Sequence, residues 1–216
     1  MFIPLPRLPK ARQTSTPRQK AAAVPEVADA RDEKHEAILD AALDLFSERG
    51  FYGTAVPLLA ERANVAAGTI YRYFESKEAI VNALYRREKL LLGTALLAAF
   101  PFESAPRDQF HYFWTTACEF ARAHPKTLAF LELHHHQSYL DETSRAIEAQ
   151  ILSPAYSFFT MTQENKVTKP FAPEVLGSIV WGAFVGLVRA SWEKRIVLTD
   201  KTIAQGEMCV WEAIRR

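Results

Sequence analysis

The sequence predicts an all-α protein, and three observations lead to this prediction. Apolar residues recur at helical spacing in most of the chain, and the first such stripe is Ile38, Ala41, Ala42, Leu45 and Phe46. No stretch shows strand-like alternation bounded by hairpin turns. Residues that start or stop helices, such as Gly50 and Pro125, separate the periodic segments. We therefore expect two helical domains, at residues 32–90 and 91–216, after an N-terminal arm at residues 1–31.

Composition limits the class of protein. The chain has 216 residues, 49% of them hydrophobic and 24% charged, which is typical of soluble globular domains. Its two cysteines, Cys118 and Cys209, offer no disulfide framework, so we expect core packing for both and a reducing cytoplasm. The longest nearly uncharged runs, 90–102 and 175–188, are shorter than the roughly 20 residues that span a membrane. We expect buried helices there and no membrane partner.

Residues 1–31 are rich in Pro, Ala, Arg and Lys and carry a net charge of +4. They lack apolar periodicity after Leu8, which predicts a disordered basic arm. A solvated tail is the interpretation we favour, and an arm that attracts nucleic-acid phosphates is the alternative.

After a first helix at about residues 32–49, the stretch from Thr54 to Lys77 predicts two short helices joined by a tight turn. Asn64 stands at the break and tolerates left-handed backbone. In the second short helix, Ile70 and Phe74 are four apart and can share a buried face. The side chains left on the other faces are polar or aromatic: Thr69, Tyr71, Arg72 and Tyr73. A helix-turn-helix presents its second helix in this way to the major groove of DNA.

These residues resemble the DNA-binding motif of the TetR family of bacterial transcriptional regulators. The matching pieces are Ala60, Ala63 and Val65, the run GTIYRYF at 68–74, the triplet Ser76, Lys77 and Glu78, and the upstream run ILDAALDLFSERGFYGT at 38–54. The resemblance covers roughly residues 33–85, and an accidental match in a plain helical bundle is the alternative. The chain departs from the usual family residue at Pro57. It also has Ala66 where the family usually has a serine N-cap, and Ala67 where the family often has a polar residue.

Base readout is expected from the second short helix. Arg72 is the strongest candidate for a guanine contact, and its alternative is a surface charge paired with Glu75 or Ser76. Thr69 and Tyr71 would assist, and the methyl group of Ala67 can touch a thymine methyl.

Three further residues are expected to contact phosphates and so to fix the register on DNA. They are Thr54, Tyr73 and Lys77. We also expect Thr54 to be the N-cap of the first of the two short helices. Gly68 would let the backbone approach DNA or the first helix closely.

The net charge of +1 does not by itself indicate a nucleic-acid-binding protein, and residues 32–90 carry a net charge of −2. Six acidic residues lie on the first helix, however, and the placement of charge matters more than its sum. They are Asp32, Glu33, Glu36, Asp40, Asp44 and Glu48.

A long helix from Lys77 to about Phe100 would bridge the two domains and carry ligand-induced movement to the DNA-binding unit. The later helices are expected at residues 107–124, 126–136, 140–163 with Pro154 inside, 173–195 and 200–215. The resemblance implies a ligand cavity among them, for which Trp114, His134 and Tyr156 are candidate lining residues.

The run His134, His135 and His136 invites a metal-site hypothesis. Consecutive helical residues point about 100° apart, so three adjacent imidazoles cannot converge on one ion. We expect one buried and two exposed histidines, and neither a metal site nor a cofactor.

Small residues four apart mark one face of the helix at 173–195, namely Ser178, Gly182, Gly186 and Ala190. Two glycines inside a helix suggest close approach of another helix. The resemblance implies that the last two helices, including Met208 and Trp211, form a four-helix dimer interface. Packing within the chain is the alternative.

Taken together, the sequence and the resemblance predict a cytoplasmic, homodimeric regulator, most simply a repressor. It would bind a palindromic double-stranded DNA operator and be released by a small-molecule effector. The alternative is an all-α metal-dependent enzyme or ligand carrier. The sequence contains no HExxH, phosphate-loop or EF-hand motif, so we expect no enzyme.

Overall fold

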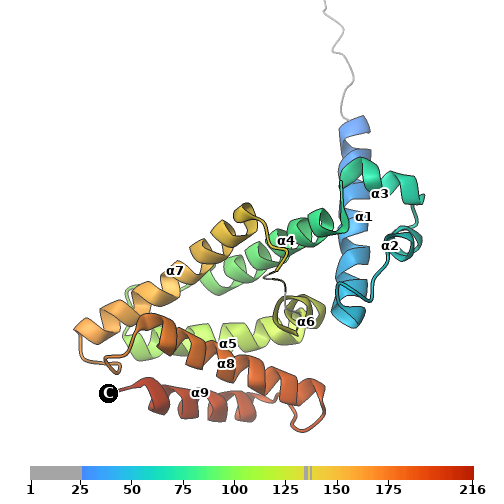
Figure 1. Cartoon of the computed structure of the whole chain (residues 1–216). Helices are drawn as coiled ribbons and strands as arrows, with labels where there is room; N and C mark the ends of the chain where they lie inside the picture. The colour runs from blue at the N-terminus through green and yellow to red at the C-terminus, as the bar shows by residue number, and fades with distance from the viewer. Residues whose placement is uncertain (1–25, 134–135, 137) are drawn as a thin grey trace, which may run out of the picture.

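The computed structural model describes residues 26–133, 136 and 138–216, and the prediction of an all-α fold is confirmed. Within these residues the chain forms nine helices (Figure 1): α1 (Glu26–Arg49), α2 (Val56–Arg62), α3 (Ala67–Tyr73), α4 (Lys77–Leu97), α5 (Pro106–Ala123), α6 (Pro125–Leu133), α7 (Glu142–Glu164), α8 (Pro173–Trp192) and α9 (Asp200–Ile214). The β-structure of this part is an isolated bridge between Thr168 and Arg215.

The first helix begins earlier than the sequence predicted, at Glu26 instead of residue 32. Residues 26–31 therefore continue α1, because Glu, Ala, Asp and Arg follow Pro25 without a helix breaker. Most of the predicted basic arm, residues 1–25, lies outside the described residues.

The turns of the small domain follow their sequence signals. Gly50 ends α1 with φ 67°, and Asn64 joins α2 to α3 with φ 53°, so both predicted turn positions are confirmed. Ser76 caps α4, where its hydroxyl accepts the backbone N–H of Ala79 at 3.1 Å. These three residues fix the directions of α2, α3 and α4.

Two hydrophobic cores hold the helices together. The first combines α1–α4 with residues of α5 and α6 and the following segment, including Phe120, Phe130, Leu131 and Leu140. Phe46 of α1 and Phe130 of α6 stack with centroids 6.3 Å apart. The second core lies among α5, α7, α8 and α9. The first core thus extends across residue 90, where the sequence places its domain boundary.

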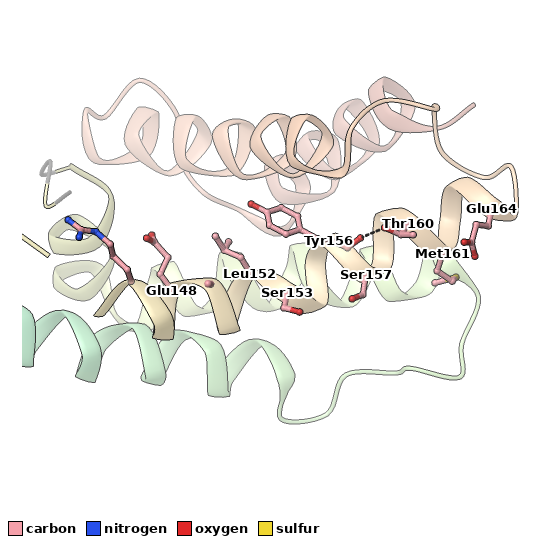
Figure 2. Close-up of a pocket in the computed structure, with 10 residues that line it drawn as sticks. Glu148, Leu152, Ser153, Tyr156, Ser157, Thr160, Met161 and Glu164 are labelled. Atoms are coloured by element: carbon pink, nitrogen blue, oxygen red, sulfur yellow. Dashed lines mark hydrogen bonds between the residues drawn. The ribbon is translucent and has the colours of Figure 1, made fainter. Parts of the chain in front are cut away.

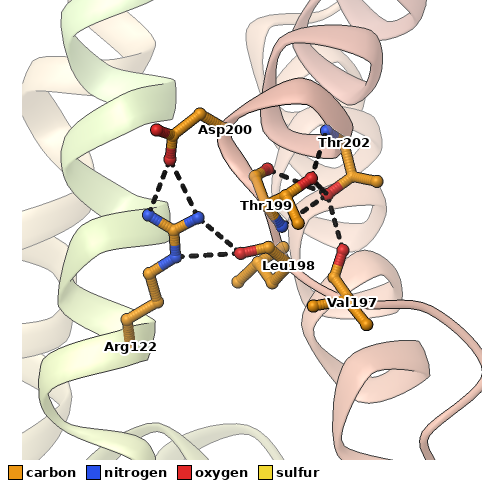
Figure 3. A network of polar contacts seen from close by, with 6 residues as sticks. All are labelled: Arg122, Val197, Leu198, Thr199, Asp200 and Thr202. Atoms are coloured by element: carbon orange, nitrogen blue, oxygen red, sulfur yellow. Dashed lines mark hydrogen bonds and ion pairs between the residues drawn. The ribbon is translucent and has the colours of Figure 1, made fainter.

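A polar network attaches α9 to α5 (Figure 3). The Arg122 guanidinium donates to the Leu198 carbonyl and to the Asp200 carboxylate, the latter at 3.0 Å. The Thr199 hydroxyl caps α9 by accepting the backbone N–H of Thr202 at 3.2 Å. In turn, the Thr202 hydroxyl accepts the backbone N–H of Thr199, which completes a capping box. The network fixes the start of α9 beside the end of α5.

Helix α8 has a buried face and an open face. Its core residues recur every four positions and are Leu176, Val180, Phe184 and Val188. Within the described residues, α8 is the helix whose length and hydropathy would suffice to cross a membrane, and 22% of its apolar window is buried. The run at 175–188 lies inside this helix of 20 residues, which ends at Trp192, three residues before the end of the predicted helix at 173–195. The predicted burial of the run holds for one face of the helix.

The two cysteines differ in burial. Cys118 lies in the second core, as predicted, whereas Cys209 is exposed on α9. The prediction of core packing for Cys209 is wrong, because the apolar stripe of α9 runs through Ile203, Val210 and Ile214 and leaves Cys209 outside it.

Candidate nucleic-acid interface and ligand cavity

Helix α3 combines a small buried anchor with an exposed polar surface. Ile70 and Phe74 are buried in the first core, as the four-residue spacing predicted. Tyr71 is 59% exposed, and Arg72, Ala67 and Gly68 are exposed beside it. Ala66 is the N-cap of α3 and supplies no side-chain hydrogen bond, so no N-cap side chain occupies the backbone N–H groups of the first turn, of which that of Thr69 donates to the Ala66 carbonyl at 2.8 Å. This surface can donate hydrogen bonds to an acidic polymer.

Arg72 provides the positive charge of this surface. Among the described residues it has no ion pair within 4.0 Å, so the alternative of a charge paired with Glu75 does not hold in this structure. The hydroxyl of Ser76, the other alternative partner, instead caps α4. An exposed guanidinium on a short, firmly anchored helix has the geometry that base or phosphate recognition requires.

The neighbours of Arg72 are held more closely to the protein. Thr69 and Tyr73 are half-buried, and the Tyr73 ring lies 6.5 Å from the His35 ring of α1. A Cβ added at Gly68 would meet nothing within 4 Å, so the predicted close approach to the first helix is wrong. The open surface at Gly68 leaves approach to DNA as its remaining predicted role.

Thr54 does not belong to the interface, which corrects two predictions. Its side chain is 0% exposed, and its hydroxyl donates to the carbonyls of Gly50 at 2.9 Å and Leu45 at 3.3 Å. The N-cap of α2 is Ala55, which provides no side-chain bond. Thr54 turns inward because the turn after Gly50 leaves backbone carbonyls that need a donor. It therefore shapes the turn and cannot reach a phosphate.

Lys77 also has a partner inside the protein. Its ammonium donates to the carbonyls of Phe51 at 2.8 Å and Thr54 at 3.0 Å and lies 4.0 Å from the centroid of the Phe51 ring. These contacts hold the start of α4 against the turn between α1 and α2. In this structure Lys77 positions the elements of the interface with two of its three ammonium N–H groups. A contact of the third N–H with a DNA phosphate stays a prediction.

Three of the six acidic residues predicted on the first helix form ion pairs with cations of other helices. Arg87 of α4 binds Glu36 and Asp40 at 2.9 Å each. Burial alone would raise the pKa of Glu36, but the hydrogen bonds from Arg87 and His35 outweigh it and lower this pKa. These pairs reduce the repulsion between the small domain and a polyanion.

Asp44 is the third neutralised acid of α1. It binds Arg62 of α2 at 3.2 Å and Lys126 of α6 at 2.6 Å. Lys126 lies outside residues 32–90, so it adds one positive charge to the surface around Asp44 that the net charge of −2 does not include.

A partly open cavity of about 870 Å³ lies among α4, α5, α6, α7 and α8. Its wall is mostly apolar and aromatic, including Leu92, Leu96, Leu97, Phe100, Phe102, Phe110, Phe113, Ile151, Phe159, Val180 and Trp181. Tyr156 lines it, as predicted. Trp114 is 1% exposed in the second core and donates its indole N–H to the Ile203 carbonyl at 2.9 Å, so its predicted lining role is wrong. His134 lies outside the described residues.

The polar end of the cavity contains a cluster of charged and aromatic residues. Lys89 of α4 lies 3.7 Å from Glu132 of α6 and 3.8 Å from Glu148 of α7. The Trp181 indole donates to Glu132 at 2.9 Å, and the Tyr85 hydroxyl donates to Glu148 at 2.7 Å. Burial, with the hydrogen bond to Glu148, raises the pKa of Tyr85. We call these five residues the polar cluster.

The outer side of the cavity meets a groove of about 710 Å³ along α7 (Figure 2). Glu148, Leu152, Ser153, Tyr156, Ser157 and Met161 line both spaces. Tyr156 projects from α7 toward α8, where a Cβ added at Gly177 would meet its ring at 3.4 Å. The groove and the cavity therefore share α7 as a common wall.

None of the five residues of the polar cluster was among the lining residues predicted from the sequence. Tyr85 and Lys89 are four apart on α4, a spacing that places both on one face of the helix. A lysine on the otherwise apolar face with Leu92 was the available signal. Glu132 and Glu148 carry no such signal in the sequence, because their approach to Lys89 depends on how α6 and α7 pack.

The histidine run gives no support for a metal site. Within residues 26–133, 136 and 138–216 no group of three His, Cys, Asp or Glu side chains could hold a metal ion. His136 is buried and donates its Nε2–H to the Phe130 carbonyl at 2.6 Å. The predicted exposure of His134 and His135 lies outside the described residues.

The small-residue stripe of α8 faces away from the protein. Ser178, Gly182 and Gly186 are exposed, and Ala190 is half-buried. A Cβ added at Gly182 or Gly186 would meet nothing within 4 Å, so no described segment of this chain packs on them. On α9, Met208 is 58% exposed. Trp211 is half-buried, with its ring 5.1 Å from Phe110. The open face can accept another helix.

Comparisons with known proteins match both parts of the chain. Residues 38–84 match the family described as bacterial regulatory proteins, tetR family, and residues 90–216 match the tetracyclin repressor-like C-terminal domain. The HTH-type transcriptional regulator RutR of Escherichia coli (strain K12) is 31% identical over 153 residues, which are 69% of this chain and 71% of RutR. The uncharacterized HTH-type transcriptional regulator YhgD of Bacillus subtilis (strain 168) is 25% identical over 180 residues, 81% of this chain and 92% of YhgD.

Solved structures show the same fold. A TetR family transcription regulator from Marinobacter aquaeolei VT8 superposes with a TM-score of 0.78 at 20% identity, covering 87% of this chain and 98% of that one. A TetR-family transcriptional regulator from Haemophilus influenzae Rd superposes with a TM-score of 0.71 at 21% identity, covering 87% and 99%.

Proposed function

The chain belongs to the TetR family of bacterial transcriptional regulators, and from this premise we propose that it is a homodimeric repressor. It binds a palindromic DNA operator through two α3 helices and leaves the operator when a small molecule fills the cavity. Members of this family are regulators of transcription, not enzymes, so the alternative of a metal-dependent enzyme is set aside. We place its action in the cytoplasm, where its DNA target lies.

The observation that carries the proposal is the surface of α3. Arg72 and Tyr71 are exposed there, and Arg72 has no ion pair within the described residues. The helix is anchored from below by Ile70 and is flanked by the capped start of α4 at Ser76. A firmly held helix loses little conformational freedom on binding, which favours specific contact with bases.

Dimerisation is supported by the open face of α8 and α9. Its glycines allow close approach of a second helix, and Met208 adds apolar surface. A two-fold axis through this face would give two recognition helices for the two half-sites of a palindrome.

Release by an effector is supported by the shared position of α4. Lys77 holds its first turn against the turn between α1 and α2, next to α3 in the small domain, while Tyr85, Lys89 and Leu92 line the cavity. A ligand that moves the cavity end of α4 would move its other end, and with it α3.

The proposal is tested by gel-shift titration with the promoter DNA upstream of the chain's own gene. Arg72→Ala should weaken binding by about 1–3 kcal/mol and relax the base preference, because a bidentate base contact carries sequence information. Tyr73→Phe removes only a hydroxyl and should weaken all duplexes alike if that hydroxyl contacts phosphate.

Lys201→Ala, an exposed change on α9 far from α3, is the matched control and should bind as wild type does. Equal, weak binding of wild type to promoter and random duplexes at low salt would refute the operator proposal. A monomer at micromolar concentration in analytical ultracentrifugation would refute the dimer.

A further inference from the structure

We propose that the effector is an uncharged amphipathic molecule whose hydrogen-bond-accepting oxygen binds the Lys89 ammonium. The inference rests on the proposed effector role of the cavity and adds the chemical class of its ligand. It comes from the polar cluster at one end of the cavity and the apolar wall of the remainder.

Lys89 is held in the cavity wall with hydrogen-bonding capacity to spare. The residue is 9% exposed and lines the cavity. Its nearest carboxylate oxygens, on Glu132 and Glu148, are 3.7 and 3.8 Å away, beyond hydrogen-bond distance. A lysine ammonium has three N–H donors, and burial without acceptors is costly. The cavity therefore presents a donor group to whatever enters it.

The two carboxylates already receive hydrogen bonds from the wall. Glu132 accepts from the Trp181 indole and Glu148 from the Tyr85 hydroxyl, at 2.9 and 2.7 Å. These bonds hold both carboxylates in place on either side of Lys89. The group that complements the cluster is accordingly an acceptor that reaches the ammonium.

The charges of the cluster select an uncharged acceptor. A carboxylate or phosphate bound to Lys89 would lie within a few ångströms of Glu132 and Glu148, and like charges at that range repel strongly in a poorly solvated site. The two carboxylates would attract a cationic head, but each already accepts a hydrogen bond from the wall, and the group with donors to spare is the Lys89 ammonium, which repels a cation. An amide, ester, lactone or ketone oxygen satisfies the donor and adds no charge.

The remainder of the cavity fits an apolar body. Leu92, Leu96, Phe100, Phe110, Phe113 and Val180 line it. Its volume of about 870 Å³ is within the roughly 300–1,000 Å³ of sites for small organic ligands. One molecule with a polar head and an apolar tail or ring system can contact both regions together.

The test compares three probes with the same decyl chain and different heads: decanamide, decanoate and decyltrimethylammonium. Each is titrated into the full-length protein without DNA, below its micelle-forming concentration, with tryptophan fluorescence and calorimetry as readouts. Trp181 lies in the cavity wall and should report binding directly. We expect decanamide to bind at least about ten-fold more tightly than the two charged probes.

Variants identify the contact. Lys89→Met keeps the apolar stem and should weaken decanamide about ten-fold or more, whereas the exposed Lys201→Met should leave binding unchanged. Glu132→Gln retains an acceptor for Trp181 and removes one repelling charge, so it should narrow the gap between decanamide and decanoate. This second variant tests the proposal even where Lys89→Met does not fold.

Several outcomes would overturn the proposal: a charged probe that binds as tightly as decanamide, unchanged binding in Lys89→Met, unchanged selectivity in Glu132→Gln, or no saturable binding of any probe. Gel shifts on the same preparations separate this failure from that of the proposed function. Operator binding with no probe binding rejects the ligand class alone. Probe binding that leaves the operator complex intact rejects effector release instead.

Discussion

Two roles were considered for Thr54, a phosphate contact and a buried structural role, and a single substitution distinguishes them. Thr54→Val keeps the size of the side chain but removes the hydroxyl that donates to Gly50 at 2.9 Å and Leu45 at 3.3 Å. The Gly50 carbonyl would lose its donor in a site with no solvent access. An unsatisfied buried polar group costs about 1–3 kcal/mol. For a chain of this size that lowers Tm by about 2–4 °C per kcal/mol.

The assay pairs thermal unfolding by circular dichroism with operator titration at a temperature where the variant is folded. We expect a lower Tm with operator affinity within about two-fold of wild type, since the hydroxyl does not reach the surface. Thr69→Val on α3 is the matched control and should show the reverse pattern, because Thr69 is a candidate for base readout. A Thr54→Val protein with wild-type Tm and a large loss of operator affinity would refute the buried role.

Three other predictions concern the cap of α4, a buried thiol and an ion pair. Ser76→Ala removes the hydroxyl that accepts the Ala79 N–H and should lower the free energy of unfolding by about 1 kcal/mol in urea titrations; an unchanged midpoint would contradict the cap. Burial raises the pKa of Cys118 to about 12, so a Cys209→Ser variant should show no fast-reacting thiol with Ellman's reagent at pH 8 until it is denatured. The pKa of Glu36 is lowered in the folded protein, so its stabilising effect is present above its unfolded pKa near 4.5 and is lost as pH falls through the lower folded value. Glu36→Gln should therefore flatten the loss of stability below about pH 4.5, and an unchanged acid profile would exclude the ion pair with Arg87 as its cause.

The sequence predicted those features that depend on local chemistry. Gly50 and Asn64 stand where the backbone takes positive φ, and Ser76 caps the helix after it, because each signal acts within a few residues. The helix-turn-helix and the all-α fold follow from such signals in series. The exposure of Arg72 also follows from its place on α3 relative to Ile70.

Features that depend on distant packing were not predictable in this way. A threonine at a turn can face solvent or backbone carbonyls, and only the fold of residues 45–54 shows that Thr54 faces inward. Arg87 is 47 and 51 residues away from its partners Asp40 and Glu36, so the neutralisation of α1 leaves no local pattern. Trp114 was an aromatic residue among many, and its place in the second core depends on α9.

The stacking of Phe130 on Phe46 has a consequence for domain recombination between regulators of this family. The first core contains residues from both sides of position 90, among them Leu131 and Leu140. Residues 32–90 therefore do not form their hydrophobic core alone. A chimera joined at residue 90 to a foreign effector domain would place unmatched side chains beneath α1. A chimera therefore keeps the first core intact only when α6 stays with the N-terminal half or is replaced by a helix of equal shape. Because α6 supplies Phe130 to the first core and Leu131 and Glu132 to the cavity, a change in this helix would reach the DNA-binding unit and the ligand space together.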